Sequence, residues 1–148
     1  MPIPPAHIQA VVSVYLCAHP DERAALQPLL DGLDAGRDMA ARETFDGHVT
    51  TSAVIVNDHD QVLLIHHVAS NVWIQPGGHC EPSDRTLMEA VLREVAEETS
   101  LVALEPFGGI EAPIHIDVHE LEARPERASP GIGTSMSGSS SGCAARHR

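Results

Sequence analysis

Apolar side chains near the start of the chain repeat at the spacing of a helix. Five of them follow one another at i, i+3, i+4, i+7 and i+8, so that they share one face. These residues are Ile8, Val11, Val12, Tyr15 and Leu16. The pattern predicts an amphipathic helix, which should end at His19 and Pro20.

A second helical repeat follows over residues 26–33, with leucine at positions 26, 29, 30 and 33. Asp21 is the N-cap expected for it. Pro28 should kink or split this helix, because proline lacks the N–H of the intrahelical bond. We expect the helical pair to pack on its own domain. A contact with a neighbouring domain, or with a second copy in a homodimer, is the alternative.

β-branched residues dominate the next segment and predict strands. Residues 49–56 and 62–65 should form a hairpin through a turn at 57–60, and residues 72–75 should form a short strand. Trp73 is expected in the core. Apolar positions at helical spacing then predict a helix over 84–99 with Asp84 as its cap. Alternating apolar residues predict a strand over 114–121.

Composition divides the chain into three parts. Residues 1–44 form a helical extension, 45–128 a strand and helix core, and 129–148 a tail in which ten residues are Ser or Gly. Ser/Gly segments bury too little surface to order themselves, so the tail is expected to be disordered. The fold class predicted is α/β or α+β, a mixed sheet flanked by helices.

The charge balance excludes several functions. The formal net charge is −12, with no basic cluster of the kind that binds duplex nucleic acid. Three scattered cysteines fit a reducing compartment, and neither a leader segment nor a membrane span is indicated. We therefore expect a cytoplasmic protein that acts on a small phosphorylated molecule, with no duplex nucleic acid and no membrane as partner.

Three carboxylates are concentrated on one side of the helix predicted over 84–99. Glu94, Glu97 and Glu98 are spaced i, i+3, i+4 and are therefore neighbours on the helix surface. Such a cluster repels itself unless a cation offsets the charge. The alternative is a solvated helix face, stabilised by pairs of Arg93 with Glu89 and Glu97 at i±4.

The segment 77–100, GGHCEPSDRTLMEAVLREVAEETS, resembles the box of the Nudix (MutT-like) hydrolase family. The resemblance rests on the double glycine, on the Arg-Glu-x-x-Glu-Glu core from Arg93 to Glu98, and on a preceding Pro-Gly-Gly turn. Asp84 stands where the first glutamate of the box is usual, the spacer to Arg93 is one residue longer, and Ser100 replaces the final glycine. The helical pair resembles extensions of bacterial members.

This resemblance implies a magnesium-dependent enzyme that hydrolyses a diphosphate linkage, often of a nucleoside. It implies Glu94, Glu97, Glu98 and the Gly77 carbonyl as ligands of Mg²⁺, with Mn²⁺ as an alternative metal. Glu97 and Glu98 are then the catalytic carboxylates, and Arg93 orients a glutamate.

Weaker candidates for substrate contact lie in the turn itself, at Gly78, His79 and Glu81. Cys80 lies in the same loop, but no paired base accompanies it, which argues against a nucleophile. Two other functions stay open on this fold, an inactive ligand-binding remnant and a prenyl diphosphate isomerase.

The resemblance also implies a further strand and helix after residue 127. The Ser/Gly tail stands there instead, and we expect a truncated or frameshifted end. Codons that encode residues 128–142 can be chosen such that a frame starting two bases later reads EPGHWHLDVRFLFR, which alternates as a strand does. A natural disordered tail is the alternative, and the nucleotide sequence past residue 127 decides between them.

Overall fold

A computed structural model describes residues 2–44, 47–106, 112–121, 135–136 and 143–147. Its elements are the helices α1 (Pro5–Ala18), η1 (Pro20–Ala24), α2 (Gln27–Asp34) and α3 (Leu87–Thr99), and the strands β1 (Thr50–Asn57), β2 (Ile65–His67), β3 (Val72–Ile74), β4 (Gly77–His79), β5 (Glu105–Pro106), β6 (Glu120–Leu121), β7 (Ser135–Met136) and β8 (Cys143–His147). No helix within the described ranges has the length and apolar character needed to cross a bilayer.

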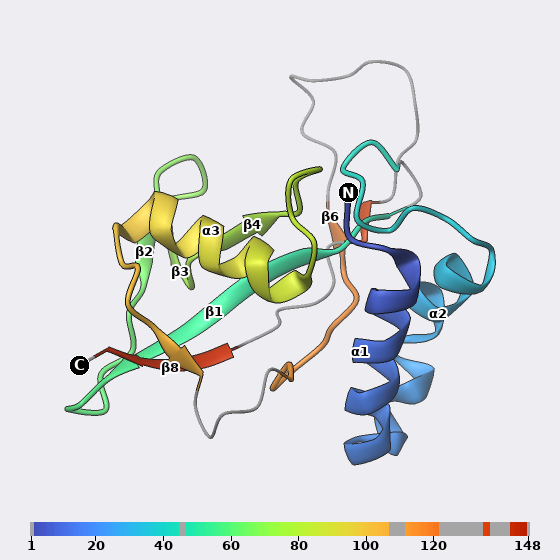
Figure 1. The fold of residues 1–148 in the computed structure, drawn as a ribbon, viewed down its shortest axis with the longest axis horizontal. Coiled ribbons are helices and arrows are strands. Elements are labelled where there is room, and N and C mark those ends of the chain that lie inside the picture. Colours follow the sequence, from blue (N-terminus) through green and yellow to red (C-terminus); the bar gives the residue numbers. More distant parts are fainter. Residues whose placement is uncertain (1, 45–46, 107–111, 122–134, 137–142, 148) are drawn as a thin grey trace.

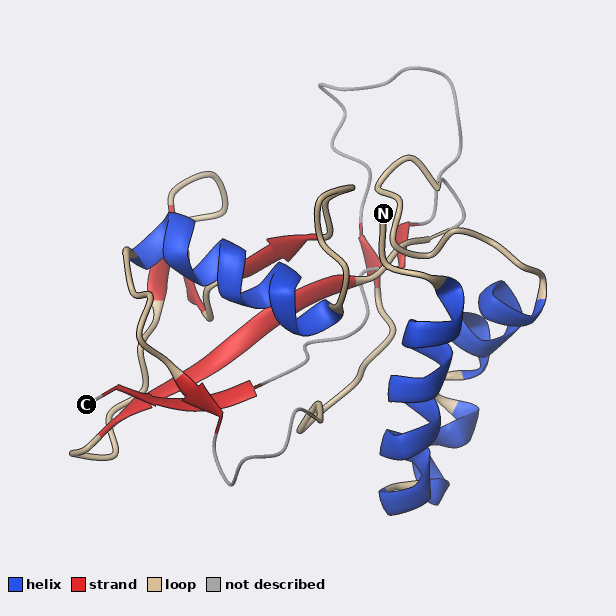
Figure 2. Ribbon diagram, in the orientation of Figure 1, coloured by secondary structure: helices blue, strands red, loops and turns tan. Residues whose placement is uncertain are grey.

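The main sheet is mixed, as the sequence predicts. Its strand order is β4–β1–β8–β5. β1 pairs antiparallel with β4, where Thr50 faces His79, and parallel with β8, where Ala53 faces Cys143. α3 lies over β1 and β4, while α1 and α2 stand together at one end of the sheet (Figures 1 and 2). This arrangement is the α+β class that the sequence predicts.

The helical pair packs on its own domain, and a shared core explains how. Ile8, Val12 and Leu29 from the extension lie in one buried cluster with Val49 and Leu87. A second, smaller cluster lies between α3 and β1, formed by Ala53, Ile55, Val91 and Val95. The extension and the sheet therefore share buried apolar surface, the main favourable term in folding.

The two predicted N-terminal helices are confirmed, but one cap is wrong. Pro28 does not split the second repeat, because α2 covers Gln27–Asp34 and Pro28 lies in its first turn, where the missing N–H costs no intrahelical hydrogen bond. A separate short helix, η1, precedes it and ends at Ala24. Asp21 is not the N-cap, because it lies inside η1 and Leu26 precedes α2.

The predicted strand over 114–121 is mostly wrong. Only Glu120 and Leu121 form a strand, β6, and His115 makes a single bridge. The alternating pattern correctly marks Ile116, which is buried against the extension, but Ile114 is 54% exposed. A segment with one buried side chain satisfies the pattern without joining a sheet.

Trp73 does not lie in the core, contrary to the prediction. Its side chain is 67% exposed, and its ring centroid lies 5.1 Å from that of His66. The reason is that β2 and β3 form a separate two-stranded sheet. The predicted strand over 62–65 accordingly starts only at Ile65, and Val62 makes one isolated bridge to Val56.

The segment 129–148 also differs from the prediction of a disordered tail. Residues 143–147 form β8, which lies between β1 and β5, and residues 135–136 form β7. Strand pairing uses backbone groups, so a segment without apolar periodicity can still satisfy the open side of β1. The remaining residues of this segment lie outside the described ranges.

Caps fix both ends of α3. Thr86 is the N-cap, and its hydroxyl accepts a hydrogen bond from the Glu89 N–H at 3.0 Å. Ser100 closes the other end in a left-handed conformation at φ 62°, and its N–H donates to Ala96 O at 2.9 Å. Ser100 stands where the usual box has glycine, and its left-handed conformation costs a residue with a Cβ more than it costs glycine.

We expect Ile8→Ala to destabilise the whole chain by about 3 kcal/mol, because it opens a cavity in the shared core. Chemical denaturation followed by circular dichroism, at wavelengths that report helix and strand, should show one common transition shifted to lower denaturant. Val14→Ala is the control, since Val14 lies on the same helix and is 60% exposed. Separate transitions for helix loss and for the sheet would contradict a shared core.

We expect Ser100→Gly to stabilise the chain by about 1 kcal/mol, because glycine adopts a positive φ without the steric cost of a Cβ. The free energy of unfolding measures the effect. Ser100→Ala keeps the Cβ and should give no gain. Equal stability changes in the two variants would show that the turn carries no strain.

Candidate active site

Arg93 stands at the centre of the site and ties the turn to α3. Its Nη2 donates to Asp84 Oδ2 at 2.9 Å, and its Nε to Asp84 Oδ1 at 3.1 Å. The same Nη2 donates to the carbonyl oxygen of His79 at 2.9 Å. The Asp84 side chain is only 5% exposed and that of Arg93 19%, so the pair is largely shielded from water.

Asp84 is therefore a partner of Arg93 and not the predicted helix cap. The helix begins three residues later, and Asp84 instead accepts a hydrogen bond from the Glu81 N–H at 2.7 Å. Burial by itself raises the pKa of Asp84, but the hydrogen bonds from Arg93 and from the Glu81 backbone outweigh it and leave the pKa lowered. The carboxylate is thus held in its charged form.

Arg93 also reaches two of the three clustered glutamates. Its Nη1 lies 3.0 Å from Glu94 Oε1 and 3.5 Å from Glu97 Oε2. The expected pair with Glu89 does not form, because Glu89 binds Arg85 at 2.7 Å instead. Hydrogen bonding to Asp84 is the main cause that raises the pKa of Arg93.

Glu94 faces the double glycine. Its carboxylate lies so close to Gly78 that a Cβ there would stand 2.6 Å from the carboxylate atoms. The Glu94 side chain is 17% exposed. Burial is the largest influence and raises the pKa of Glu94, and hydrogen bonding to Arg93 opposes this without reversing it. Glycine at position 78 is what lets the carboxylate approach the turn.

Glu98 and Glu97 lie further toward solvent. Glu98 Oε2 accepts a hydrogen bond from the Gly77 N–H at 2.9 Å, which joins α3 to β4. The Glu97 side chain is 58% exposed. Gly77 packs against the Thr51 carbonyl oxygen and Ser52 of β1, where no side chain would fit. The structure thus brings Gly77, Gly78 and the carboxylate side of α3 together.

The donor set suits a hard divalent cation in its chemistry, since carboxylate and carbonyl oxygens are the ligands that Mg²⁺ prefers. Within the described ranges, no three His, Cys, Asp or Glu side chains converge tightly enough to enclose a metal ion. Glu94 is engaged with Arg93, and Glu98 with the Gly77 N–H. A metal ion with few protein ligands and several waters fits these residues better than an all-protein cage.

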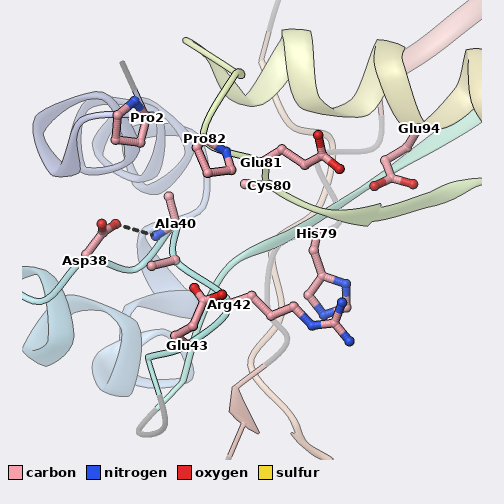
Figure 3. Close-up of a pocket in the computed structure, with 11 residues that line it drawn as sticks. Pro2, Asp38, Ala40, Arg42, Glu43, His79, Cys80, Glu81, Pro82 and Glu94 are labelled. Carbon is pink, nitrogen blue, oxygen red and sulfur yellow. Dashed lines mark hydrogen bonds between the residues drawn. The ribbon is translucent and has the colours of Figure 1, made fainter.

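A cavity of about 410 Å³ opens beside Glu94. His79 and Glu81, two predicted substrate contacts, line it, whereas Gly78 lies against Glu94 outside its lining. Figure 3 shows that the opposite wall comes from the end of the helical extension, residues 38–43. Sequence reasoning missed this wall, because the polar, turn-rich segment 34–47 looks like an ordinary domain boundary.

Two histidines lie together, and one of them, His79, lines this cavity. The ring centroids of His48 and His79 are 5.0 Å apart. His48 is only 6% exposed, and its ring nitrogens have no hydrogen-bond partner among the described residues. Burial, and to a lesser extent the charge of Arg42, lower the pKa of both histidines.

Cys80 is not placed for chemistry, in agreement with the sequence. It is 7% exposed, and its Sγ lies 3.8 Å from the Val49 carbonyl oxygen. Burial raises the pKa of the thiol to about 12, so the reactive thiolate is strongly disfavoured.

We expect Asp84→Asn to destabilise the chain by about 3 kcal/mol, because it removes the most buried of the charge partners of the shielded Arg93. Since the pKa of Asp84 is lower in the folded than in the unfolded chain, its contribution is present above about pH 4 and is lost as the pH falls through the folded-state pKa. Unfolding measured from pH 7 to pH 3 should therefore show the stability difference between variant and wild type shrink below about pH 4.

Glu89→Gln is the matched control, since it removes an exposed carboxylate that is paired with Arg85 on the same helix. It should leave stability nearly unchanged. A constant difference between Asp84→Asn and wild type at all pH values would contradict the assignment.

Comparison with known proteins agrees with this geometry. The family model described as NUDIX domain matches residues 46–124, more than half of the chain. The m7GpppN-mRNA hydrolase NUDT17 of Danio rerio is 37% identical over 89 residues, which are 55% of this chain and 29% of that protein. The protein of the same name from Bos taurus is 40% identical over 55 residues, 33% of this chain and 18% of that protein.

The chain thus spans less than a third of the length of these vertebrate relatives. Neither of them tests the prediction of a bacterial member. The matched segment contains β1, the double glycine and the whole of α3 with its carboxylates. The sequence prediction of the family is confirmed, and the chain belongs to the Nudix family.

Proposed function

We propose that this protein hydrolyses a diphosphate linkage in a nucleoside diphosphate derivative or a related small molecule. The observation that carries the proposal is the close approach of Glu94 to Gly78, with Glu98 bound to the neighbouring Gly77 N–H. These two contacts hold carboxylates of α3 against the turn that carries Gly77 and Gly78. Diphosphates need such a site, because their charge repels an attacking water or hydroxide.

In this proposal Glu94, Glu97, Glu98 and the Gly77 carbonyl oxygen hold Mg²⁺, or Mn²⁺ in its place. The metal, when bound, neutralises phosphate charge and lowers the pKa of a coordinated water. Of the carboxylates, Glu97 and Glu98 are the more exposed, and one of them accepts the proton of the attacking water. Arg93 acts as a positioning residue, since its donors bind Asp84, Glu94 and the His79 carbonyl.

The names of the relatives suggest one candidate substrate. Their printed name describes hydrolysis of an m7GpppN-mRNA cap, in which phosphates link two nucleosides. We include a cap analogue among the substrates to test, together with nucleoside triphosphates, nucleotide sugars, ADP-ribose and dinucleoside polyphosphates. A cytoplasmic protein that acts on such small phosphorylated molecules fits the acidic composition.

We expect Glu98→Gln and Glu97→Gln each to lower turnover at least about 100-fold, because each removes a charged ligand or base. The measurement is phosphate or nucleotide release with Mg²⁺ or Mn²⁺, and chelation of the metal should abolish it. Glu89→Gln should retain activity, since Glu89 lies on the same helix and pairs only with Arg85 among the described residues.

Folded wild-type protein that turns over none of these substrates with either metal would instead support a ligand-binding remnant of the fold. Calorimetric titration with Mg²⁺ and a nucleoside diphosphate separates that function from no function at all. Turnover that survives in both Glu97→Gln and Glu98→Gln would show that the reaction does not use this face of α3.

A further inference from the structure

The cavity beside Glu94 has two walls of different origin, and we call it the extension pocket. One wall is the box turn, with His79, Cys80, Glu81 and Pro82, next to Glu94 of α3. The other is residues 38–43, the end of the helical extension (Figure 3). Its volume of about 410 Å³ lies within the range of small-ligand pockets, about 300 to 1,000 Å³. The extension therefore helps to form the space next to the proposed reaction centre.

The wall of the extension is held in place. Met39 and Ala40 are buried in the shared core, 1% and 6% exposed. The Val49 N–H donates to the Met39 carbonyl oxygen at 2.7 Å, and the Thr44 hydroxyl donates to the Asp38 carbonyl oxygen at 2.6 Å. Because the loop is anchored on both sides of Arg42, the backbone at position 42 is fixed before any ligand binds.

Arg42 is the one Lys or Arg among the described residues that line this pocket. Its side chain is exposed, and its guanidinium lies beside the imidazole of His79 (Figure 3). No hydrogen bond or ion pair joins Arg42 to another described residue. Arg93, by contrast, already donates hydrogen bonds to Asp84, Glu94 and the His79 carbonyl oxygen. The N–H groups of the Arg42 guanidinium are thus available to donate hydrogen bonds to a ligand.

The surroundings of Arg42 show what kind of ligand it fits. Four carboxylates line the same pocket, so an anionic substrate would be repelled from this space without a cation there. They belong to Asp38, Glu43, Glu81 and Glu94. Arginine binds phosphate through two parallel hydrogen bonds, which gives it both strength and direction. Glu94, which lines the pocket, is also the residue that approaches Gly78 in the box turn.

We propose that the extension pocket holds a phosphate-bearing part of the substrate and that Arg42, supplied by the extension, is its anion-binding residue beside His79. This inference rests on the proposed function, because it assigns the position of the same phosphorylated substrate. It gives the helical extension a direct part in substrate binding, in addition to its place in the core.

The test compares Arg42→Ala, Arg42→Lys and wild type in two measurements. The first is steady-state kinetics on the best substrate of the panel above with Mg²⁺, where we expect Arg42→Ala to raise KM about 10- to 100-fold, the effect of losing charge-assisted hydrogen bonds. Arg42→Lys should recover only part of this loss, because lysine keeps the charge but not the fork. The second is calorimetric binding of inorganic diphosphate with Mg²⁺, where the dissociation constant should rise by a similar factor.

Arg23→Ala is the matched control, since it removes the same charge from an exposed position on η1 that does not line the pocket. It should behave as wild type in both measurements, and circular dichroism should show that all variants are folded. A protein that hydrolyses its substrate with the same KM in Arg42→Ala and wild type would overturn the inference and leave the proposed function intact.

Wild type that turns over no substrate but binds diphosphate, and loses this binding in Arg42→Ala, would overturn the proposed hydrolysis and support the pocket. Wild type that neither turns over the panel nor binds diphosphate would overturn both. An equal loss of affinity in Arg23→Ala and Arg42→Ala would show that the loss comes from the change in net charge and not from a contact of Arg42 with the ligand. That result would also overturn the assignment.

Discussion

The shielded ion pair between Arg93 and Asp84 is the interaction on which the candidate site depends. It joins the turn after β4 to the middle of α3, and the hydrogen bond from Arg93 to the His79 carbonyl adds the end of β4 to the same group. Glu94 follows Arg93 directly in the helix, so the distance from its carboxylate to Gly78 is set by how Arg93 is held. Breaking a shielded pair costs more than forming it gains, because the remaining charge is left without a partner.

Charge balance explains why this arrangement calls for additional cations. Four carboxylates lie within ion-pair distance of Arg93, those of Glu81, Asp84, Glu94 and Glu97. A single guanidinium cannot neutralise four carboxylates. A divalent ion among the glutamates and the guanidinium of Arg42 across the pocket would both oppose this excess, from different sides of the substrate. The proposed function and the proposed role of Arg42 are thus two consequences of one electrostatic problem.

The sequence predicted the elements whose signal is local. The helical spacing identified α1, α2 and α3, and the box motif identified the face on which the carboxylates lie. It failed where the outcome depends on distant partners. Whether Trp73 is covered depends on which strands join the main sheet, and whether residues 114–119 form a strand depends on a partner for their backbone. The alternation of apolar and polar residues along one segment gives no information on which other segments pair with it or cover it.

Arg42 was missed for a related reason. Nothing in the segment 34–47 distinguishes one polar residue from another, and only the packing of Met39 and Ala40 shows that this loop is anchored against the box turn. A single exposed arginine becomes a candidate ligand once the neighbouring Arg93 is seen to be fully engaged.

The longer spacer of the box now has a structural account. Eight residues separate Asp84 from Arg93, yet the two side chains meet at 2.9 Å. The helix does not start at Asp84 but at Leu87, after a cap by Thr86. Because residues 85 and 86 are not helical, the added residue changes only the path of the turn. Within α3 the spacing from Arg93 to Glu98 is unaltered, so the carboxylates keep their mutual positions. The added residue of the box therefore lies in the turn before α3 and does not change the spacing of the carboxylates within the helix.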